Sequence, residues 1–314
     1  MPRGRELSVA GAIAALFAAL SMTVPQYFSR GNLTDLFLTN GPVLLVALGM
    51  TLVILTGEID ISVGSIFAIA SIAAGVAAKF GAPPLIAGLV ACVAGAAFGA
   101  INGTLVAYLR VPSIVATLAA MVALRDGLRW TTQGAWIENL PSDFQWMGWS
   151  QTSYPAMMLA VVASLTIAIA WSLRNLAAGR AIYATGSHEE AARLAGMRTR
   201  LVKFCVFALL GALTGFAAAL NSARFNQIPS NTGLGLEMKV IAAVVVGGAA
   251  VTGGSGTILG TVLGVVLMGA IGPALTFLGV NAYWEKAIQG GIILAAIVID
   301  ALRSRKHGAR LARA

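Results

Sequence analysis

About ten long apolar segments follow one another along this chain, and they constrain its fold more than any other feature. A helix of about 20 apolar residues crosses a bilayer. Hydrophobic residues make up 58% of the 314 positions and charged residues 11%, against about a quarter in soluble domains. The sequence therefore predicts an all-α polytopic membrane protein, a single transmembrane domain over 1–314. We expect about eight to ten spans. The ten candidates are 7–24, 40–56, 61–79, 84–109, 113–131, 154–173, 201–222, 237–252, 257–279 and 284–302.

Basic residues predict the orientation of such a chain, because lysine and arginine collect in the short cytoplasmic loops of membrane proteins. With the N-terminus inside and these spans, most of the 21 lysines and arginines fall on the cytoplasmic side. The net charge of +9 is then explained without a nucleic-acid partner. We expect a multi-pass protein surrounded by lipid, with both termini cytoplasmic. The basic residues on that side are Arg3, Arg5, Arg110, Arg174, Arg180, Arg193, Arg198, Arg200, Lys203, Arg303, Arg305, Lys306, Arg310 and Arg313.

Aromatic residues mark the longest loop on the outer side, at about 131–153. Trp136, Trp146 and Trp149 lie within it. Tryptophan rings settle at the level of the lipid headgroups, so we interpret this outer loop as an interface belt more readily than as a substrate contact. Docking of a protein on the outer side is compatible with either interpretation.

Glycines four residues apart recur in several of the apolar segments. This spacing lets helix backbones approach closely in lipid, where no hydrophobic effect drives helices together. The pattern predicts a tight bundle and says little about function. The glycines are Gly95, Gly99 and Gly103, then Gly211 and Gly215, then Gly256, Gly260 and Gly264.

A short charged helix is expected at about 187–197, on the predicted cytoplasmic side. Ser187 and Glu190 have the spacing of a capping box, in which each side chain bonds to the backbone of the other residue. Gly196 suits the left-handed conformation that ends many helices. Such a helix is either a docking surface or a solvated loop helix with no partner.

Motifs for catalysis or nucleotide binding are missing from the sequence. The glycine-rich string at 252–257 lacks the lysine of a phosphate-binding loop, so we expect a tight turn there. His188 starts a His-Glu-Glu-Ala-Ala string that lacks the second histidine of a zinc motif. Cys92 and Cys205 lie in apolar runs, which favours packing over a disulfide or a metal site. We expect no enzymatic activity, no cofactor and no metal in this chain.

Polar residues at membrane depth are costly and therefore mark functional candidates. Glu58 and Asp60 lie in a break between two apolar runs, where Asp60 or Ser62 can cap the helix that follows. A role in a conduit or gate is the alternative. Asn102 and Asn221 either line a cavity or bridge helices by hydrogen bonds. The candidates for a translocation path or gate are thus Glu58, Asp60, Asn102 and Asn221.

Three charged residues lie near the outer end of the span at 113–131. Asp126 and Arg129 are three residues apart and can form an ion pair on one face of a helix. Together with Arg125, they are interpreted as an interfacial structural group more readily than as ligands of a substrate.

Several strings, in order from about residue 40 to 300, resemble the ribose-type sugar permeases of bacterial ABC importers. They are Gly57–Ser65 (GEIDISVGS), Asn102–Leu118, Gly179–Gly186 and Gly235–Gly248. Within this family, two further strings are most similar to rhamnose and autoinducer-2 import permeases. These are Trp136–Pro141 and Asn226–Lys239.

The resemblance implies a vitamin B12 permease-like (type II importer) fold in the bacterial cytoplasmic (inner) membrane. It also implies three partners: a second permease copy or paralogue, a cytoplasmic ABC ATPase that uses ATP and Mg, and a periplasmic sugar-binding protein. In this family a cytoplasmic loop helix couples permease and ATPase. The matching residues, which we expect to form the coupling surface, are Ser187, His188, Glu189, Glu190, Arg193, Leu194, Gly196 and Met197.

The expected function is that of the permease subunit of an ATP-driven importer, working by alternating access. Its substrate would be a monosaccharide or related small polyol, with a rhamnose-like sugar or autoinducer-2 favoured. The alternative is a proton-coupled secondary sugar carrier, but Glu58 and Asp60 lie beside a helix break and not at mid-span. An intramembrane enzyme or scaffold would need a nucleophile–base or metal pair. The sequence leaves open which sugar is carried and whether the chain pairs with itself.

Overall fold

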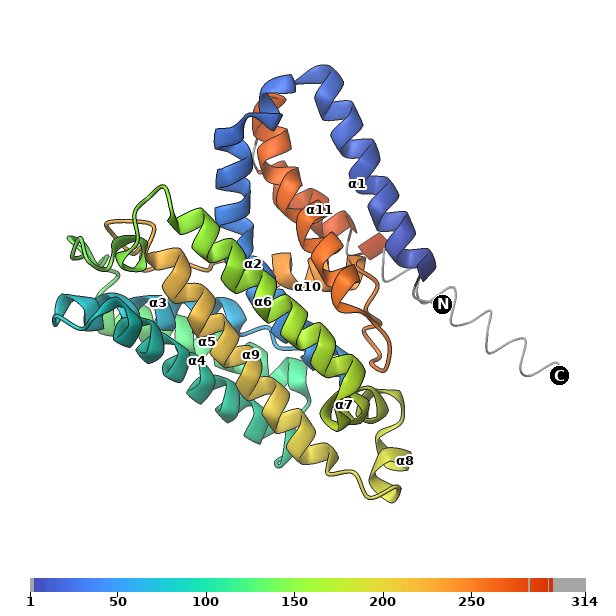
Figure 1. Ribbon diagram of the computed structural model, residues 1–314. Coiled ribbons are helices and arrows are strands. Elements are labelled where there is room, and N and C mark those ends of the chain that lie inside the picture. The colour runs from blue at the N-terminus through green and yellow to red at the C-terminus, as the bar shows by residue number, and fades with distance from the viewer. Residues whose placement is uncertain (1–2, 282, 293, 296–314) are drawn as a thin grey trace.

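The computed structural model describes residues 3–281, 283–292 and 294–295, which form helices joined by short loops (Figure 1). No β-strand occurs in this part of the chain, only an isolated antiparallel bridge between Ile137 and Ile228. The helices are α1 (Arg3–Thr23), α2 (Arg30–Leu55), α3 (Val63–Lys79), α4 (Pro84–Ala107), α5 (Ser113–Thr132), α6 (Tyr154–Asn175), α7 (Ala177–Ser187), α8 (Glu189–Leu194), α9 (Thr199–Ser222), α10 (Leu236–Val246) and α11 (Ile258–Phe277), with 3-10 turns η1 (Pro25–Phe28) and η2 (Gln145–Gly148).

Six helices are long and apolar enough to cross a membrane, namely α1, α2, α4, α6, α9 and α11. The predicted all-α, multi-pass character is therefore confirmed. Helix α3 is apolar but has 17 residues, and α5 carries Arg125, Asp126 and Arg129. The expected span at 237–252 is wrong in length, because α10 ends at Val246. The expected span at 284–302 and the basic tail that follows run beyond the described residues.

Helix α2 lies at the centre of the bundle and packs against α6, α9, α10 and α11 (Figure 1). It starts at Arg30, well before the expected residue 40, with Ser29 as its N-cap. The side chain of Ser29 accepts a hydrogen bond from the N–H of Asn32, which satisfies one free donor of the first turn. From Gly41 to Leu55 almost every residue is buried. A helix that is apolar on all sides is buried in this way.

Helices α4 and α9 approach through their glycines, as the spacing predicted. A Cβ atom added to Gly95 would lie 2.2 Å from the carbonyl oxygen of Gly211. A Cβ on Gly99 would meet the carbonyl oxygen of Phe207 at 2.4 Å. Neither position has room for a side chain. The two backbones are therefore in direct contact. Helices in lipid associate through such close packing, because the hydrophobic effect does not favour their association there.

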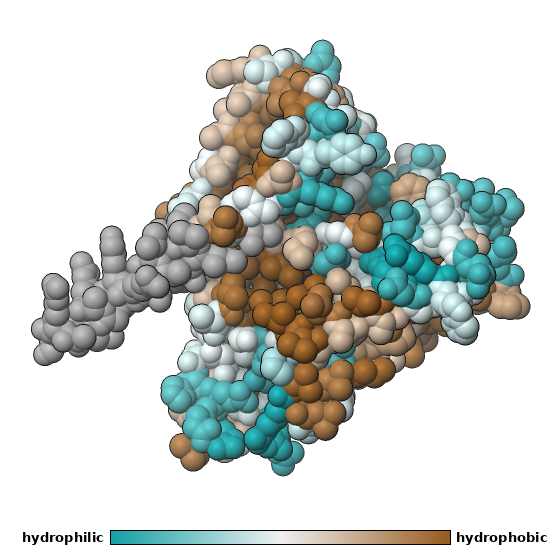
Figure 2. Space-filling view, turned by 180° about the vertical axis from the view of Figure 1, so that it is seen from behind, coloured by the Kyte–Doolittle hydropathy of each residue, from teal (hydrophilic) through white to brown (hydrophobic). Residues whose placement is uncertain are grey.

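The molecule has two opposite ends. One end holds the end of α2, helices α7 and α8, the start of α9 and the 250–257 turn; we name it the α8 end. Helix α9 runs from there to the other end, where the 133–153 loop lies (Figure 1). Figure 2 shows a broad hydrophobic area across the middle of the rear face, with hydrophilic residues gathered toward the ends. This distribution suits a protein that spans a bilayer.

Candidate functional site

Helices α7 and α8 follow each other with only His188 between them. His188 is the N-cap of α8, and its Nδ1 accepts a hydrogen bond from the N–H of Ala191 at 3.2 Å. The predicted capping box is therefore wrong. Ser187 is the last residue of α7, and its hydroxyl lies against the backbone of Gly254. Glu190 pairs instead with Arg193 at 2.5 Å.

The other end of α8 forms as predicted. Gly196 adopts a φ of +84°. The N–H groups of Gly196 and Met197 donate to the carbonyls of Arg193 and Ala192, the pattern of a Schellman motif. Both ends of this six-residue helix are thus satisfied by its own segment.

The residues expected to form the coupling surface are almost all at the surface. Seven of the eight are exposed and Met197 is half-buried. Leu194 stands out, because 79% of this apolar side chain is exposed at the end of α8. The role of these residues in coupling stays a prediction, but the geometry leaves them free to meet a partner protein.

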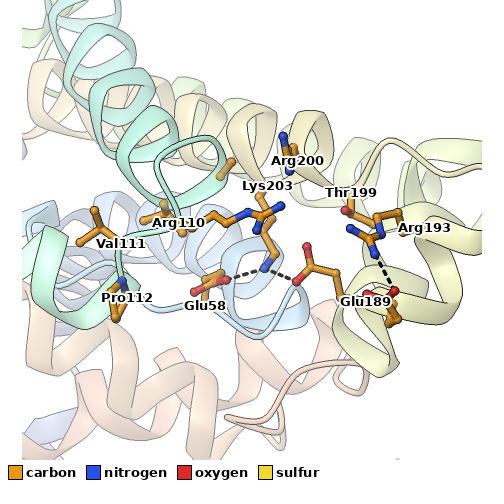
Figure 3. Close-up of a pocket in the computed structure, with 12 residues that line it drawn as sticks. Glu58, Arg110, Val111, Pro112, Glu189, Arg193, Thr199, Arg200 and Lys203 are labelled. Carbon is orange, nitrogen blue, oxygen red and sulfur yellow. Dashed lines mark hydrogen bonds and ion pairs between the residues drawn. The ribbon is translucent and has the colours of Figure 1, made fainter.

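Lys203 joins α8 to the rest of the molecule. Its Nζ donates to Glu58 Oε1 at 2.6 Å and to Glu189 Oε2 at 2.7 Å (Figure 3). The three residues come from α9, from the break after α2 and from the start of α8. Side-chain exposure is 12% for Lys203 and 16% for Glu58, so the inner pair is well shielded from water. We name this group the Lys203 cluster.

The Lys203 cluster borders a charged cavity of about 480 Å³. Figure 3 shows side chains around it from the break after α2, the α4–α5 loop, α8 and the start of α9. The pKa of Glu189, which lies outside the spans, is lowered. Burial raises it, but the hydrogen bond and the charge of Lys203 outweigh that effect. The acidic and basic lining residues are Glu58, Arg110, Glu189, Glu190, Arg193, Arg200 and Lys203.

Glycines give α7 a second, rigid connection to the core. A Cβ atom on Gly186 would lie 1.8 Å from the carbonyl oxygen of Leu55, the last residue of α2. The same carbonyl accepts a hydrogen bond from the N–H of Gly254 at 3.0 Å. Tyr183 of α7 donates to the carbonyl of Gly256 at 2.8 Å. The 252–257 string is thus a tight turn, as predicted, and α7 cannot move without α2 and this turn.

Three of the four candidate path residues lie near this end of the molecule. Glu58 belongs to the Lys203 cluster. Asp60 is fully buried and accepts hydrogen bonds from the N–H and the hydroxyl of Ser62 at 2.8 and 2.7 Å. Asn102 of α4 donates to Asp60 Oδ2 at 3.2 Å and to the Ser62 hydroxyl at 2.8 Å. These bonds fasten α4 to the start of α3, and a role in a path stays a prediction.

Asn221 lies at the opposite end of α9. It lines a larger cavity of about 820 Å³, bounded by α2, α10 and the segment 283–290. Eighteen residues of helix separate it from Lys203, or about 27 Å. The four candidates therefore do not form one site. Glu237, which the sequence did not single out as a site residue, is buried and lines this second cavity, and Arg125 of the predicted interfacial group is buried as well.

Comparison with known proteins assigns the family. Residues 32–297 match the family described as the permease component of the branched-chain amino acid transport system. The chain belongs to this permease family. The permease is 38% identical over 296 residues to the autoinducer 2 import system permease protein LsrC of Yersinia pseudotuberculosis serotype O:3 (strain YPIII), covering 94% of this chain and 84% of the relative.

Relatives from other genera bear the same name. The permease is 37% identical over 301 residues to LsrC of Salmonella typhi, covering 94% of this chain and 85% of that one. It is 35% identical over 299 residues to LsrC of Photorhabdus laumondii subsp. laumondii, covering 94% of this chain and 89% of the relative. No solved structure matches the chain significantly. The predicted resemblance to importer permeases, autoinducer-2 permeases among them, is confirmed.

Proposed function

We propose that the permease is the membrane subunit of an ATP-driven importer of autoinducer-2 or a closely similar small sugar or polyol. The observation that carries this proposal is similarity along nearly the whole chain to relatives named for autoinducer 2 import. The alignments cover 94% of this chain and include the α8 end as well as the second cavity. A rhamnose-like sugar is the next substrate to test.

Helix α8 is the proposed docking surface for a cytoplasmic ABC ATPase, which would bind ATP and Mg. Two observations support this. The helix has satisfied ends and exposes Leu194 beside charged side chains, which leaves these residues accessible to a partner. Behind it, the Lys203 cluster and Gly186 connect α7 and α8 firmly to α2 and α9. Closure of the ATPases would then move these helices together.

Such movement would alternate the access of the path between the two sides of the membrane. ATP and the loaded binding protein would each favour one conformation, because a ligand shifts an equilibrium only through unequal affinity for its two states. The substrate would pass along a path formed with a second permease copy or paralogue. The ATPase, and not this chain, would hydrolyse ATP.

The proposed arrangement has about ten spans in a vitamin B12 permease-like fold in the bacterial inner membrane. The α8 end would face the cytoplasm, with both termini on that side, and the 133–153 loop would face the periplasmic binding protein. The distribution of basic residues supports this orientation, since Arg174, Arg180, Arg193, Arg198 and Arg200 lie around α8.

The first experiment measures uptake of autoinducer-2 by cells that carry the complete importer, with and without this permease. ATP-dependent uptake that requires the permease is expected. Uptake that is driven by a proton gradient alone would overturn the proposal and favour the secondary carrier.

The second experiment tests docking by co-purification of the ATPase in detergent. Leu194→Asp is expected to lose the ATPase, because a charge replaces the exposed apolar contact. Trp149→Ser, at the opposite end and 55% exposed, is the matched control and should retain it. An ATPase that binds both variants equally well would show that α8 is not the docking surface.

A further inference from the structure

The charged cavity at the α8 end, which we name the α8 cavity, holds two arginines without a carboxylate partner. Its lining has four basic and three acidic side chains. The acidic side chains are already paired, because two belong to the Lys203 cluster and the third, Glu190, pairs with Arg193. Arg110 and Arg200 line the same cavity and form no ion pair within the described residues. One more carboxylate would therefore balance the charge of the lining.

Both arginines are held where an arginine is unfavourable. Arg110 has a φ of +58°, in the left-handed region that favours glycine. The four other such residues besides glycine in the described chain all lie in the 133–153 loop at the opposite end. Arg200 is the second residue of α9, where the partial positive charge of the helix start repels a cation. Strained backbone gathers at functional sites, and a cation at a helix start makes that start more attractive to an anion.

The α8 cavity adjoins the proposed docking surface. Residues of α8 line one side of it and the α4–α5 loop lines another (Figure 3). Each of these segments also exposes a leucine. Leu109, which precedes Arg110, is 65% exposed, and Leu194 of α8 is 79% exposed. A protein that covers α8 would therefore meet this cavity and the α4–α5 loop as well.

We propose that the α4–α5 loop is a second docking element for the ATPase, and that the α8 cavity receives an acidic side chain of the ATPase that pairs with Arg110 and Arg200. This inference rests on the proposed function and specifies how its ATPase partner is recognised. A guanidinium can donate two parallel hydrogen bonds to one carboxylate. A single carboxylate also balances the lining, whereas the three acidic residues already present disfavour an anion of higher charge.

The test measures the affinity of the ATPase for the full-length permease in nanodiscs of phosphatidylcholine, which contain no anionic lipid. Arg110→Gln and Arg200→Gln are each expected to raise the Kd at least about tenfold at low salt, because each removes a charged hydrogen-bond donor. Added salt should weaken the parent complex more than either variant complex, since salt screens charges. Arg180→Gln is the matched control, because Arg180 is an exposed arginine of α7 that does not line the cavity. It should bind the ATPase like the parent.

A second variant distinguishes a docking contact from support of the fold. Arg110→Gly removes the side chain and also relieves the left-handed backbone. We expect the melting temperature of this permease to be equal to that of the parent or higher, while its affinity for the ATPase falls as in Arg110→Gln. A lower melting temperature with parental affinity would show that Arg110 supports the fold, and would overturn the inference.

Chemical modification tests the charge of the group that enters the cavity. In a permease whose Cys92 and Cys205 are replaced by serine, Arg110→Cys provides the only thiol. It is treated with a thiol reagent that carries either an ammonium or a sulfonate group, before the ATPase is added. The ammonium should restore binding and the sulfonate should weaken it further. Equal effects of the two reagents would exclude an acidic partner.

The outcomes separate this inference from the proposed function. If the ATPase does not bind the parent permease, docking fails and the proposed function fails with it. If Leu194→Asp loses the ATPase while Arg110→Gln and Arg200→Gln retain the parental affinity and salt dependence, the inference alone is overturned. A difference between the parent and Arg110→Gln that appears only after phosphatidylglycerol is added would assign the arginines to lipid and overturn it as well.

Discussion

The two ends of α9 treat buried charge in opposite ways. At the α8 end, the Nζ of Lys203 lies 2.6 and 2.7 Å from oxygens of two carboxylates and pairs with both. At the other end, Glu237 lies near the charge of Arg125, but its Oε2 accepts no hydrogen bond within the described residues. A shielded cation bonded to carboxylates from two other segments holds the three segments together, whereas a shielded acceptor without a hydrogen bond lowers stability. The comparison separates a region held together by direct ion pairs from one in which buried polar groups are only partly satisfied.

The largest effect is expected where the α8 end has no space. Gly186→Val would push a side chain into the carbonyl of Leu55, which is 1.8 Å from the site of the first added carbon. Overpacking of this kind against backbone costs about 3 kcal/mol or more. We expect a large loss of folded permease in detergent, measured by size-exclusion chromatography and thermal unfolding.

The matched control for this change is Gly127→Ala in α5, where an added Cβ atom meets nothing within 4 Å. Alanine favours helix over glycine, so this variant should be unchanged or slightly more stable. Normal folding of Gly186→Val would mean that α7 is not firmly connected to α2, and the contrast between the two ends would lose its basis.

An intermediate effect is expected from Lys203→Met. The change leaves Glu58, 16% exposed, without its cation, and breaking a buried pair from one side costs about 3 kcal/mol. Lys203→Arg should retain most of the stability because the charge remains. Chemical unfolding in detergent measures both variants, and the transport-to-ATP ratio should fall for Lys203→Met.

The exposed pair of Glu190 and Arg193 provides the control for Lys203. Both side chains are more than half exposed, so Glu190→Gln should cost less than about 1 kcal/mol. Equal losses from Lys203→Met and Glu190→Gln would show that the Lys203 cluster is an ordinary surface ion pair and not a connection between α8 and the core.

The smallest effect is a dependence of stability on pH at Glu189. Burial raises the pKa of this carboxyl, but Lys203 outweighs burial and holds the pKa below its ordinary value of 4.5. The stabilising contribution is therefore fully present above that pH and is lost as the pH falls through the lowered value. For a side chain 46% exposed we expect about 0.5 kcal/mol.

Thermal unfolding of the parent and of Glu189→Gln, compared at pH 7 and near pH 3.5, measures this contribution. The parent should melt at the higher temperature at pH 7, and the difference should disappear in acid. A difference that persists at the lower pH would exclude ionisation of Glu189 as its source.

Patterns local in sequence determined much of this protein. The apolar segments predicted helices that cross a membrane, and six described helices have that length and character. Glycine spacing predicted close approach of helix backbones, and the contact of α4 with α9 shows it. Gly196 and the 252–257 turn also formed as expected, because a left-handed residue or a tight turn depends on the local backbone. The family could likewise be predicted from strings of adjacent residues.

Only the tertiary structure decided which distant side chains meet. Ser187 does not cap α8 because α7 continues through it and places its hydroxyl against Gly254. Glu58 forms an ion pair with Lys203, which is 145 positions away in the sequence, and no local pattern predicts that pair. Glu237 is buried beside Gly64 and near Arg125 because α3, α5 and α10 converge there. Hydrogen bonds and ion pairs act over a few ångströms, so the packing of helices, and not their sequence periodicity, selects the partners.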